Sequence, residues 1–283
     1  MDINSNTNTV CLLGHPIKHS FSPMIHNYLF KKYLKNNIYV CFDVEEEKLK
    51  DCVYGIKALN IKGCNITIPH KVNITKYLDS IDDNARLIGA VNTIKNKGGI
   101  LKGYNTDGIG FVKSILDKGY DVKNKNVMII GAGGSCRSIA IELASKGVRS
   151  IEIRNRSLDN ANKIIDIINN NFNVEANCSK DSIDSDCLMN IDILINTTPV
   201  GMESDLCPID TNIVIDKDLL VCDIVYKPKD TIFLKWAKKN NLEVVYGIDM
   251  LINQALESFK IWTNIKPCYD DFEYIKKLYE NSI

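Results

Sequence analysis

Residues 127–157, VMIIGAGGSCRSIAIELASKGVRSIEIRNRS, decide the fold class of this chain. The apolar run at 127–130 predicts a buried strand, and the glycine-rich segment 131–137 predicts a turn that leads into a helical pattern from Ser138 to Lys146. A second β-rich run follows at 150–153. The order strand, glycine turn, helix, strand predicts a βαβ unit, whose two strands lie parallel in one sheet.

Short β-rich runs alternate with helical periodicity along the rest of the chain. The further runs lie at 10–13, 37–42, 64–68, 192–195 and 242–245. Helical patterns include 108–117, 248–263 and 271–280. This alternation predicts an α/β fold with mostly parallel sheets.

The polar stretch at 123–126 precedes the most apolar strand and predicts the start of a second sheet. We therefore expect two domains, as a chain of 283 residues allows at about 150 residues per domain. Residues 1–106 form an N-terminal α/β domain, and residues 107–247 form a Rossmann-like dinucleotide-binding domain. The closing helical patterns in 248–283 exceed what one nucleotide-binding half needs, so we expect at least one of them to pack back on the first domain.

The glycine turn predicts a dinucleotide site. Gly131, Gly133 and Gly134 carry no side chains, so backbone N–H groups and a helix N-terminus can approach a pyrophosphate. The second strand ends in Arg154 and Arg156, where an NAD site usually has an acidic residue, and a guanidinium instead pairs with a 2′-phosphate. The sequence therefore predicts NADP as the cofactor, with Arg156 as the better candidate. The alternative is a structural turn followed by two surface arginines.

Two serines precede a predicted helix in the first domain. Ser22 and Pro23 form an N-cap and N1 pair, with Ser20 two residues earlier. The free N–H groups at that helix end, together with the two hydroxyls, would hold a small carboxylate. Taken alone, Ser22 would be only a cap.

Other polar side chains follow predicted strands. Lys71 comes just after a strand that stops at Pro69, at the carboxyl end where open α/β sheets bind ligands; the ordinary alternative is a surface lysine. Asp107 lies on such a turn and would also serve as the N-cap of the next helix. Further polar groups follow strands in the segments 89–93, 103–108, 196–202 and 223–228.

Charge and composition exclude several classes of protein. There are 35 basic and 35 acidic side chains and the pI is near 6.9, which argues against nucleic acid or a membrane as the main partner. The start of the chain lacks a signal-peptide pattern, so we expect a cytoplasmic protein. The 10 cysteines include no C-x-x-C pair and the 4 histidines all fall in the first quarter, so we expect no disulfide framework, metal site or Ser/His/Asp triad.

Taken together, these segments resemble the shikimate dehydrogenase family over nearly the whole chain. The motifs that carry the resemblance are GHPIKHSFSP, GCNITIPHK, GAVNTI, GYNTDGIG, GAGGSCR, NRS, INTTPVGM, DIVYKP and GIDMLINQA. The resemblance implies reversible, NADPH-linked reduction of 3-dehydroshikimate to shikimate in aromatic amino acid biosynthesis. It also implies a small-molecule substrate, and we expect a monomer or homodimer.

The resemblance assigns roles to individual residues. Lys71 and Asp107 form the catalytic pair. The residues implied at the substrate are Ser20, Ser22, Thr67, Lys71, Asn92, Asp107, Tyr226 and Gln254. The residues implied at the cofactor are Asp83, Gly131, Ala132, Gly133, Gly134, Ser135, Asn155, Arg156, Ser157, Ile224 and Gly247.

The chemistry is consistent with the lysine and aspartate pair. Hydride addition to a ketone builds negative charge on the oxygen, which an ammonium stabilises and then protonates, while a carboxylate orients the ammonium.

Asn160 stands where the family often has a second arginine, which predicts weaker selectivity for NADP. Two alternatives remain: an NAD-dependent quinate/shikimate dehydrogenase, and a non-catalytic NADP-binding sensor on the same scaffold.

Overall fold

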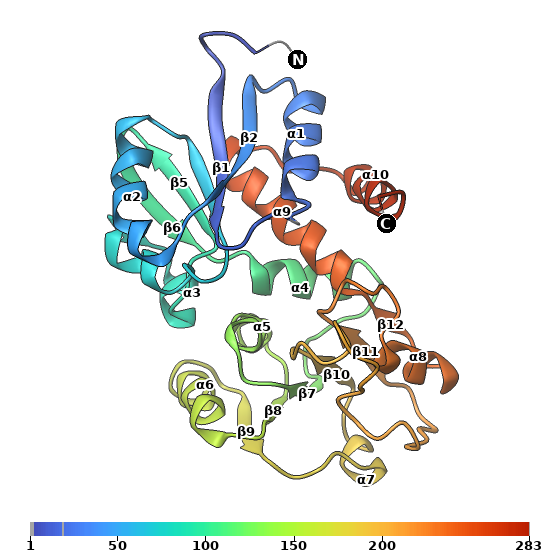
Figure 1. Ribbon diagram of the computed structural model, residues 1–283. Coiled ribbons are helices and arrows are strands. Elements are labelled where there is room, and N and C mark those ends of the chain that lie inside the picture. Colours follow the sequence, from blue (N-terminus) through green and yellow to red (C-terminus); the bar gives the residue numbers. More distant parts are fainter. Residues whose placement is uncertain (1–2, 19, 283) are drawn as a thin grey trace. The chain divides into compact units, whose positions relative to one another are not determined.

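The computed structural model describes residues 3–18 and 20–282, so His19 of the GHPIKHSFSP motif lies outside the described residues (Figure 1). The chain folds into two compact units. Unit 1 comprises Met1–Thr106 and Ile252–Ile283, and unit 2 comprises Asp107–Leu251. Helix α9 (Gly247–Thr263) contains the second boundary. No helix within the described residues has the length and apolar character needed to span a bilayer.

Unit 1 is built on a six-stranded mixed sheet in the order β2-β1-β3-β5-β6-β4. Its strands are β1 (Asn8–Gly14), β2 (Asn37–Asp43), β3 (Gly63–Ile66), β4 (Ser80–Ile81), β5 (Thr93–Lys97) and β6 (Ile100–Tyr104). β1 pairs parallel with β2 and β3, and β4 pairs parallel with β6, whereas β5 is antiparallel to β3 and β6. The sequence did not predict the β5–β6 hairpin, whose connection is Gly98–Gly99, both with positive φ, as two-residue hairpins require.

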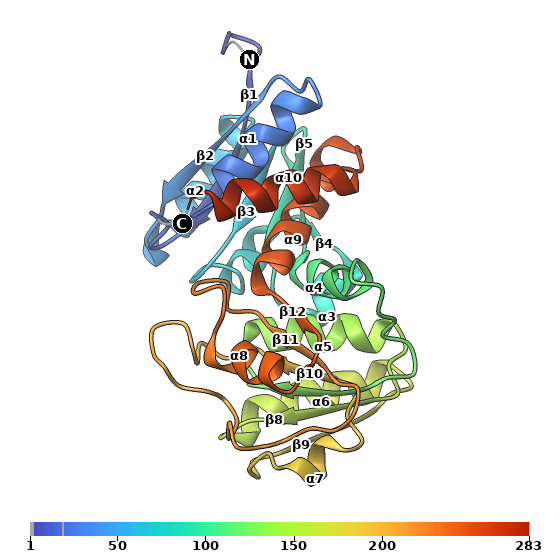
Figure 2. The ribbon, with the colours of Figure 1, turned by 90° about the vertical axis from the view of Figure 1, so that its right-hand side faces the viewer.

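Helices cover both faces of the unit 1 sheet (Figures 1 and 2). One face packs against α2 (Leu49–Ala58), α3 (Asp83–Ile88) and the short 3-10 helix η2 (Asn73–Tyr77) through an apolar core that includes Cys11, Leu13 and Ile66. The opposite face of the sheet lies toward α1 (Ser22–Lys32), α9 and α10 (Tyr269–Glu280), as Figure 2 shows. Tyr33, the C-cap residue of α1, donates a hydrogen bond to Asp271 of α10 at 2.6 Å. The closing helices therefore pack on the first domain, as the sequence predicted.

Unit 2 carries an all-parallel sheet in the order β12-β11-β10-β7-β8-β9. Its strands are β7 (Asn126–Ile130), β8 (Ser150–Arg154), β9 (Glu175–Ser179), β10 (Ile193–Asn196), β11 (Leu220–Asp223) and β12 (Val244–Val245). If the strands of unit 2 are numbered along the chain, the sheet read from β9 has the order 3-2-1-4-5-6, which is the order of the Rossmann fold. The strand order reverses between β7 and β10. The predicted Rossmann-like fold is confirmed.

The unit 2 sheet is apolar on both faces, as buried parallel sheets are. α4 (Asp107–Leu116), α5 (Gly134–Ser145) and α6 (Leu158–Asn171) pack on the face that carries Val127 and Ile129. α8 (Ile232–Lys239) and α7 (Ser185–Leu188) pack on the face that carries Met128 and Leu194.

Several predicted boundaries were wrong. α5 begins at Gly134 rather than Ser138, because its glycine-containing first turn carries no apolar periodicity. Ser22 is the first residue of α1 rather than its N-cap; Phe21 occupies the N-cap with helical φ and ψ, and no side chain caps the helix. Asp107 is likewise the first residue of its helix.

Candidate active site

One edge of the unit 1 sheet collects residues from three strands. β5 runs opposite to β3, with Thr93 facing Asn65, so the start of β5 lies beside the end of β3. Thr93 also faces Tyr104, the last residue of β6. Residues just after β3 and β6 and just before β5 therefore meet at this edge. Backbone bonds from Ile66 N to Asn92 O (2.8 Å) and from Asn92 N to Tyr104 O (3.0 Å) close it.

Asn92 and Gln254 both contact Thr106. The Asn92 side chain is 3% exposed; its Oδ1 accepts from the Thr106 backbone N–H at 2.9 Å, and its Nδ2 donates to Thr106 Oγ1 at 2.9 Å. Gln254, on α9, is half-buried, and its Oε1 accepts from Thr106 Oγ1 at 3.4 Å. The structure thus brings two residues predicted for the substrate together, 162 positions apart (254 − 92).

Thr67 and Lys71 follow β3 at the same edge. The Thr67 N–H donates to Leu13 O at 2.9 Å, and the Lys71 carbonyl accepts from Val91 N at 2.8 Å. A Cβ on Gly14, the last residue of β1, would overlap the Thr67 methyl, so only glycine lets β1 end this close to Thr67. Lys71 is half-buried rather than a fully exposed surface lysine.

Ser20 and Ser22 lie at the amino end of α1. Both are half-buried, and the Ser22 N–H donates to Ser20 Oγ at 3.3 Å. The first N–H groups of a helix have no partner inside the helix, and they favour an anion. Two hydroxyls at an uncapped helix N-terminus are suited to a carboxylate.

Asp107 and Tyr226 belong to unit 2. Asp107, at the start of α4, is 8% exposed, and Tyr226, three residues after β11, is half-buried. Asp83 lies in unit 1 at the start of α3, with a side chain 99% exposed and 4.0 Å from Arg86. Its cofactor role stays a prediction.

The carboxyl edge of the unit 2 sheet carries the glycine turn. Gly131 has a φ of 101° and donates its N–H to Arg154 O at 2.8 Å. Gly133 is the N-cap of α5, and no side chain caps this helix. A Cβ on Gly133 or Gly134 would meet no described atom within 4 Å, so packing inside the chain does not require these glycines. Ala132 and Ser135 beside them are half-buried. The open, uncapped turn fits a pyrophosphate.

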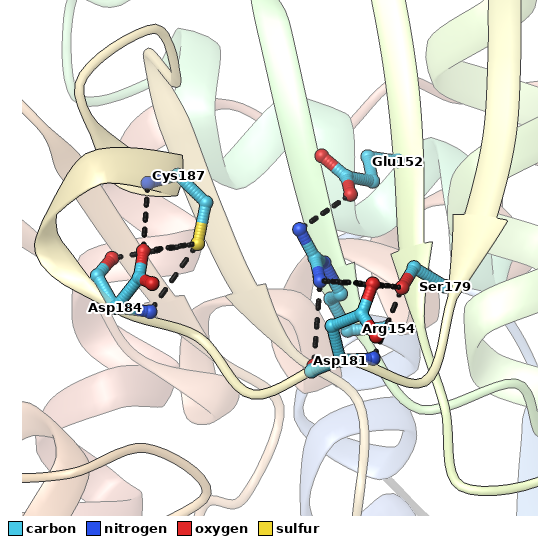
Figure 3. Close-up of polar contacts among 6 residues, drawn as sticks. All are labelled: Glu152, Arg154, Ser179, Asp181, Asp184 and Cys187. Carbon is cyan, nitrogen blue, oxygen red and sulfur yellow. Dashed lines mark hydrogen bonds and ion pairs between the residues drawn. The ribbon is translucent and has the colours of Figure 1, made fainter.

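The two arginines at the end of β8 differ. Arg154 is 11% exposed and its guanidinium lies 2.7 Å from Glu152; it also donates to the Asp181 carbonyl at 3.3 Å and to Ser179 Oγ at 3.4 Å (Figure 3). Arg156 is exposed and has no ion pair within the described part of the chain. The Arg154 side chain therefore bonds within the protein, whereas the Arg156 side chain is exposed to solvent.

The loop between these arginines is also held in place. The Asn155 N–H donates to Ser179 O at 3.1 Å, and Asn155 Nδ2 donates to the carbonyl of Ser157, the N-cap of α6, at 2.6 Å. Ser157 itself is exposed and makes no side-chain cap. The end of β9 and the start of α6 thus fix the loop that presents Arg156.

Asp223 is a residue that the sequence analysis did not single out. At the end of β11, with 1% exposure, its carboxylate accepts from Thr231 Oγ1 (2.7 Å), Asn196 Nδ2 (3.0 Å) and the Val225 N–H (3.0 Å). Burial raises its pKa to about 6. The signal was present in the sequence, as an acid directly after an apolar strand.

Asp223 joins the loops after β10 and β11, next to two predicted cofactor residues. Ile224 donates its N–H to Asn196 O at 3.1 Å. A Cβ on Gly247 would overlap the Ile224 carbonyl, so this glycine lets α9 start against the end of β11. Within residues 3–18 and 20–282, no group of three or more His, Cys, Asp or Glu side chains could hold a metal ion.

Comparison with known proteins gives a consistent result along the chain. The family models that match are the shikimate dehydrogenase substrate binding domain over residues 12–94, shikimate / quinate 5-dehydrogenase over 111–204, and the shikimate 5′-dehydrogenase C-terminal domain over 247–272. A protein of Caldanaerobacter subterraneus subsp. tengcongensis named shikimate dehydrogenase (NADP(+)) is 44% identical over 266 residues, 93% of this chain and 94% of that protein.

Solved structures give the same picture. Shikimate 5-dehydrogenase from Listeria monocytogenes, in complex with shikimate and NAD, has a TM-score of 0.92 and 35% identity, and the match covers 99% of this chain and 98% of that one. A shikimate dehydrogenase in complex with NADP+ has a TM-score of 0.88 and 42% identity, with 97% and 96% covered.

Proposed function

Because the chain belongs to the shikimate dehydrogenase family, we propose that it catalyses the reversible, NADPH-linked reduction of 3-dehydroshikimate to shikimate. It is then an NADP-dependent oxidoreductase that acts on a CH–OH group. The observation that carries the proposal is the edge of the unit 1 sheet, where Asn92 and Gln254 share Thr106 beside Thr67 and Lys71.

The cofactor side of the proposal rests on the carboxyl edge of unit 2. NADPH supplies the hydride when bound. The residues 131–135 and the N-terminus of α5 would hold its pyrophosphate, and Arg156 would pair with its 2′-phosphate. The remaining residues in this proposal are Asn155, Ser157, Ile224, Gly247 and Asp83.

The substrate side of the proposal uses side chains from several of the sequence motifs. Ser20 and Ser22 would hold the carboxylate at the start of α1. The ring hydroxyls would bind Thr67, Asn92, Tyr226 and Gln254. As hydride reaches the ketone carbon, the Lys71 ammonium would stabilise the charge on oxygen and donate the proton, oriented by the Asp107 carboxylate.

The direct test is NADPH formation from shikimate by the purified protein, in parallel with NAD and with quinate. Lys71→Ala should lower kcat by about 10²- to 10⁴-fold, the usual contribution of a proton donor. Lys76→Ala is the matched control, because this exposed lysine lies five residues on in η2 and bonds only the Asn73 side chain among described residues, at 3.1 Å.

Each outcome has a clear meaning. Turnover with shikimate and NADP that collapses in Lys71→Ala, but not in Lys76→Ala, would support the proposal. Faster turnover with NAD and quinate would favour the quinate/shikimate alternative. NADP binding without oxidation of either acid would overturn the proposed function and leave the sensor alternative.

We also propose that the enzyme works in the cytoplasm, as a monomer or homodimer, with a small molecule as its partner. Light scattering of the purified protein distinguishes the two assembly states. The absence of nucleic-acid and membrane partners stays an expectation from charge and composition.

A further inference from the structure

A serine hydroxyl lies in the interface between α9 and the unit 1 sheet. Ser258 is fully buried, one helical turn after Gln254, on the side of α9 that faces the strands. Its Oγ lies 2.8 Å from Thr93 Oγ1, 3.2 Å from Thr106 Oγ1 and 3.1 Å from Asn65 Nδ2. A buried helix face usually packs on a sheet through apolar side chains, so a hydroxyl with this many polar neighbours requires an explanation.

The partners of Ser258 are also the partners of the predicted substrate residues. Thr106 contacts both Asn92 and Gln254, as described above. Thr93 Oγ1 lies 3.0 Å from Asn92 Oδ1. Ser258 thus reaches both amide side chains through one intermediate hydroxyl in each case.

The donors and acceptors follow once the Ser258 proton is placed. Ser258 has a single hydroxyl proton; when it donates that proton to the Gln254 backbone carbonyl, 3.0 Å away, its oxygen accepts from Thr93, Thr106 or Asn65. If that acceptor is removed, the hydroxyl protons of Thr93 and Thr106 must turn to the remaining acceptors, which are Asn92 Oδ1 and Gln254 Oε1. Those atoms belong to the two amide side chains that are proposed to bind the substrate.

The hydrogen bonds around Ser258 also involve Asn65, and Tyr39 fixes the orientation of the Asn65 side chain. Tyr39 OH donates to Asn65 Oδ1 at 2.8 Å, which directs Asn65 Nδ2 toward Thr93 and Ser258. The Tyr39 ring in turn stacks on His26, with ring centroids 4.5 Å apart. The network therefore has one rigid end among aromatic rings and one end at the substrate residues.

We propose that Ser258 is a positioning residue of the substrate site, which fixes the side chains of Asn92 and Gln254 through Thr93 and Thr106. The inference rests on the proposed function and extends it to a residue that would not touch the substrate. It predicts that loss of the hydroxyl weakens substrate binding and leaves cofactor binding unchanged.

The test compares steady-state kinetics of wild type, Ser258→Ala and a control. Ser258→Ala should raise KM for shikimate by about tenfold, with KM for NADP unchanged. Ser114→Ala is the control, because Ser114 is a buried helical serine that also donates to the carbonyl four residues back, at 2.8 Å, but lies in unit 2. Loss of folded protein alone would lower kcat and leave both KM values unchanged.

A second pair of variants covers the case in which Ser258→Ala does not fold. Thr93→Val keeps the shape and removes the hydroxyl, so it should raise KM for shikimate, whereas Thr93→Ser keeps the hydroxyl and should not. A double-mutant cycle with Gln254→Ala should show that the effect of Ser258→Ala shrinks when Gln254 is absent.

The experiment distinguishes failure of the proposed function from failure of the positioning role of Ser258. If wild type does not oxidise shikimate, the proposed function is wrong. If wild type is active, but Ser258→Ala matches Ser114→Ala or adds fully to Gln254→Ala, the positioning role is wrong and Ser258 contributes only to packing.

Discussion

The two units place their polar groups differently. In unit 1, amide and hydroxyl side chains lie between the sheet and α9, where Asn65, Thr93 and Ser258 are each less than 8% exposed. In unit 2, the interiors of the central strands β7, β10 and β11 are apolar, and the polar side chains Asn196 and Asp223 occupy the last positions of β10 and β11. A pyrophosphate can be held by backbone N–H groups at a sheet edge, whereas a small polyol needs side-chain amides whose orientation is itself fixed.

The largest effect that tests this comparison is the acid stability of unit 1. Burial lowers the pKa of His26 from 6.5 to about 3, opposed in part by the Asn65 side chain. The unfolded chain takes up this proton below pH 6.5 and the folded chain does not. The free energy of unfolding should therefore fall by roughly 4 kcal/mol as the pH falls from 6.5 toward 3.

The measurement uses the two tryptophans, one in each unit. Trp262 lies 5.0 Å from the His26 ring, between centroids, so a Trp236→Phe background reports unit 1 alone. Urea unfolding across this pH range should show the slope in that background, and His26→Phe should flatten it. An unchanged slope in His26→Phe would show that another group causes the acid sensitivity.

Unit 2 should respond to pH in the opposite direction. Burial raises the pKa of Asp223 from 3.8 to about 6, so between these values the folded state binds more protons than the unfolded chain. The free energy of unfolding should then fall by roughly 3 kcal/mol as the pH rises from about 4 to about 6. Trp236, observed in a Trp262→Phe background, reports this unit. Asp223→Asn should abolish the slope, and the exposed Asp218→Asn should preserve it.

Alanine substitutions at one glycine in each unit should separate an effect on cofactor binding from an effect on stability. Gly133→Ala in unit 2 adds a methyl group that meets no described atom within 4 Å, so the melting temperature should not change. The methyl group would lie where the pyrophosphate approaches, and KM for NADP should rise by about 100-fold. Gly63→Ala in unit 1 would overlap the Trp262 indole and should lower stability by about 1–3 kcal/mol. If both variants lose stability and neither loses affinity, the glycine turn is only structural.

The smallest expected effect separates the two arginines. Arg156→Ala should raise KM for NADP about tenfold and leave KM for NAD nearly unchanged, because only the 2′-phosphate contact is lost. Arg154→Ala should leave the ratio of the two KM values unchanged and lower stability, because Glu152 loses its ion pair at 2.7 Å. A change of cofactor preference in Arg154→Ala alone would reverse the assignment.

Local signals in the sequence predicted which residues lie at the carboxyl edge of the unit 2 sheet. The glycine turn, Asn155 and Arg156 follow directly after strands, so the parallel sheet alone brings them to one edge. The choice of Arg156 over Arg154 is supported by contacts that sequence could not give, since Ser179 and Asp181 lie about 25 positions later.

The contacts that hold Asn92 and Gln254 at the edge of the unit 1 sheet were not predictable from the sequence. The position of Asn92 depends on the antiparallel pairing of β5 with β3 and with β6, and the Gly98–Gly99 turn produces only the second of these pairings. Ser258 and Asn65 are 193 positions apart and neither carries a motif that indicates contact. The helix starts at Ser22 and Gly134 were misplaced because the first turn of a helix shows little apolar periodicity.

Gly133 and Gly134 have a consequence for the descendants of this gene. Most glycines that a fold needs, such as Gly14 and Gly247, are retained as long as the protein must fold, because a methyl group there meets other atoms of the chain. At Gly133 and Gly134 a methyl group meets no described atom within 4 Å, so under the proposed function only the cofactor would oppose a larger side chain. A gene duplicate that no longer bound the nucleotide would therefore keep its fold while these two positions accumulated substitutions. Glycine at both positions in a relative would then indicate that the relative still binds a dinucleotide.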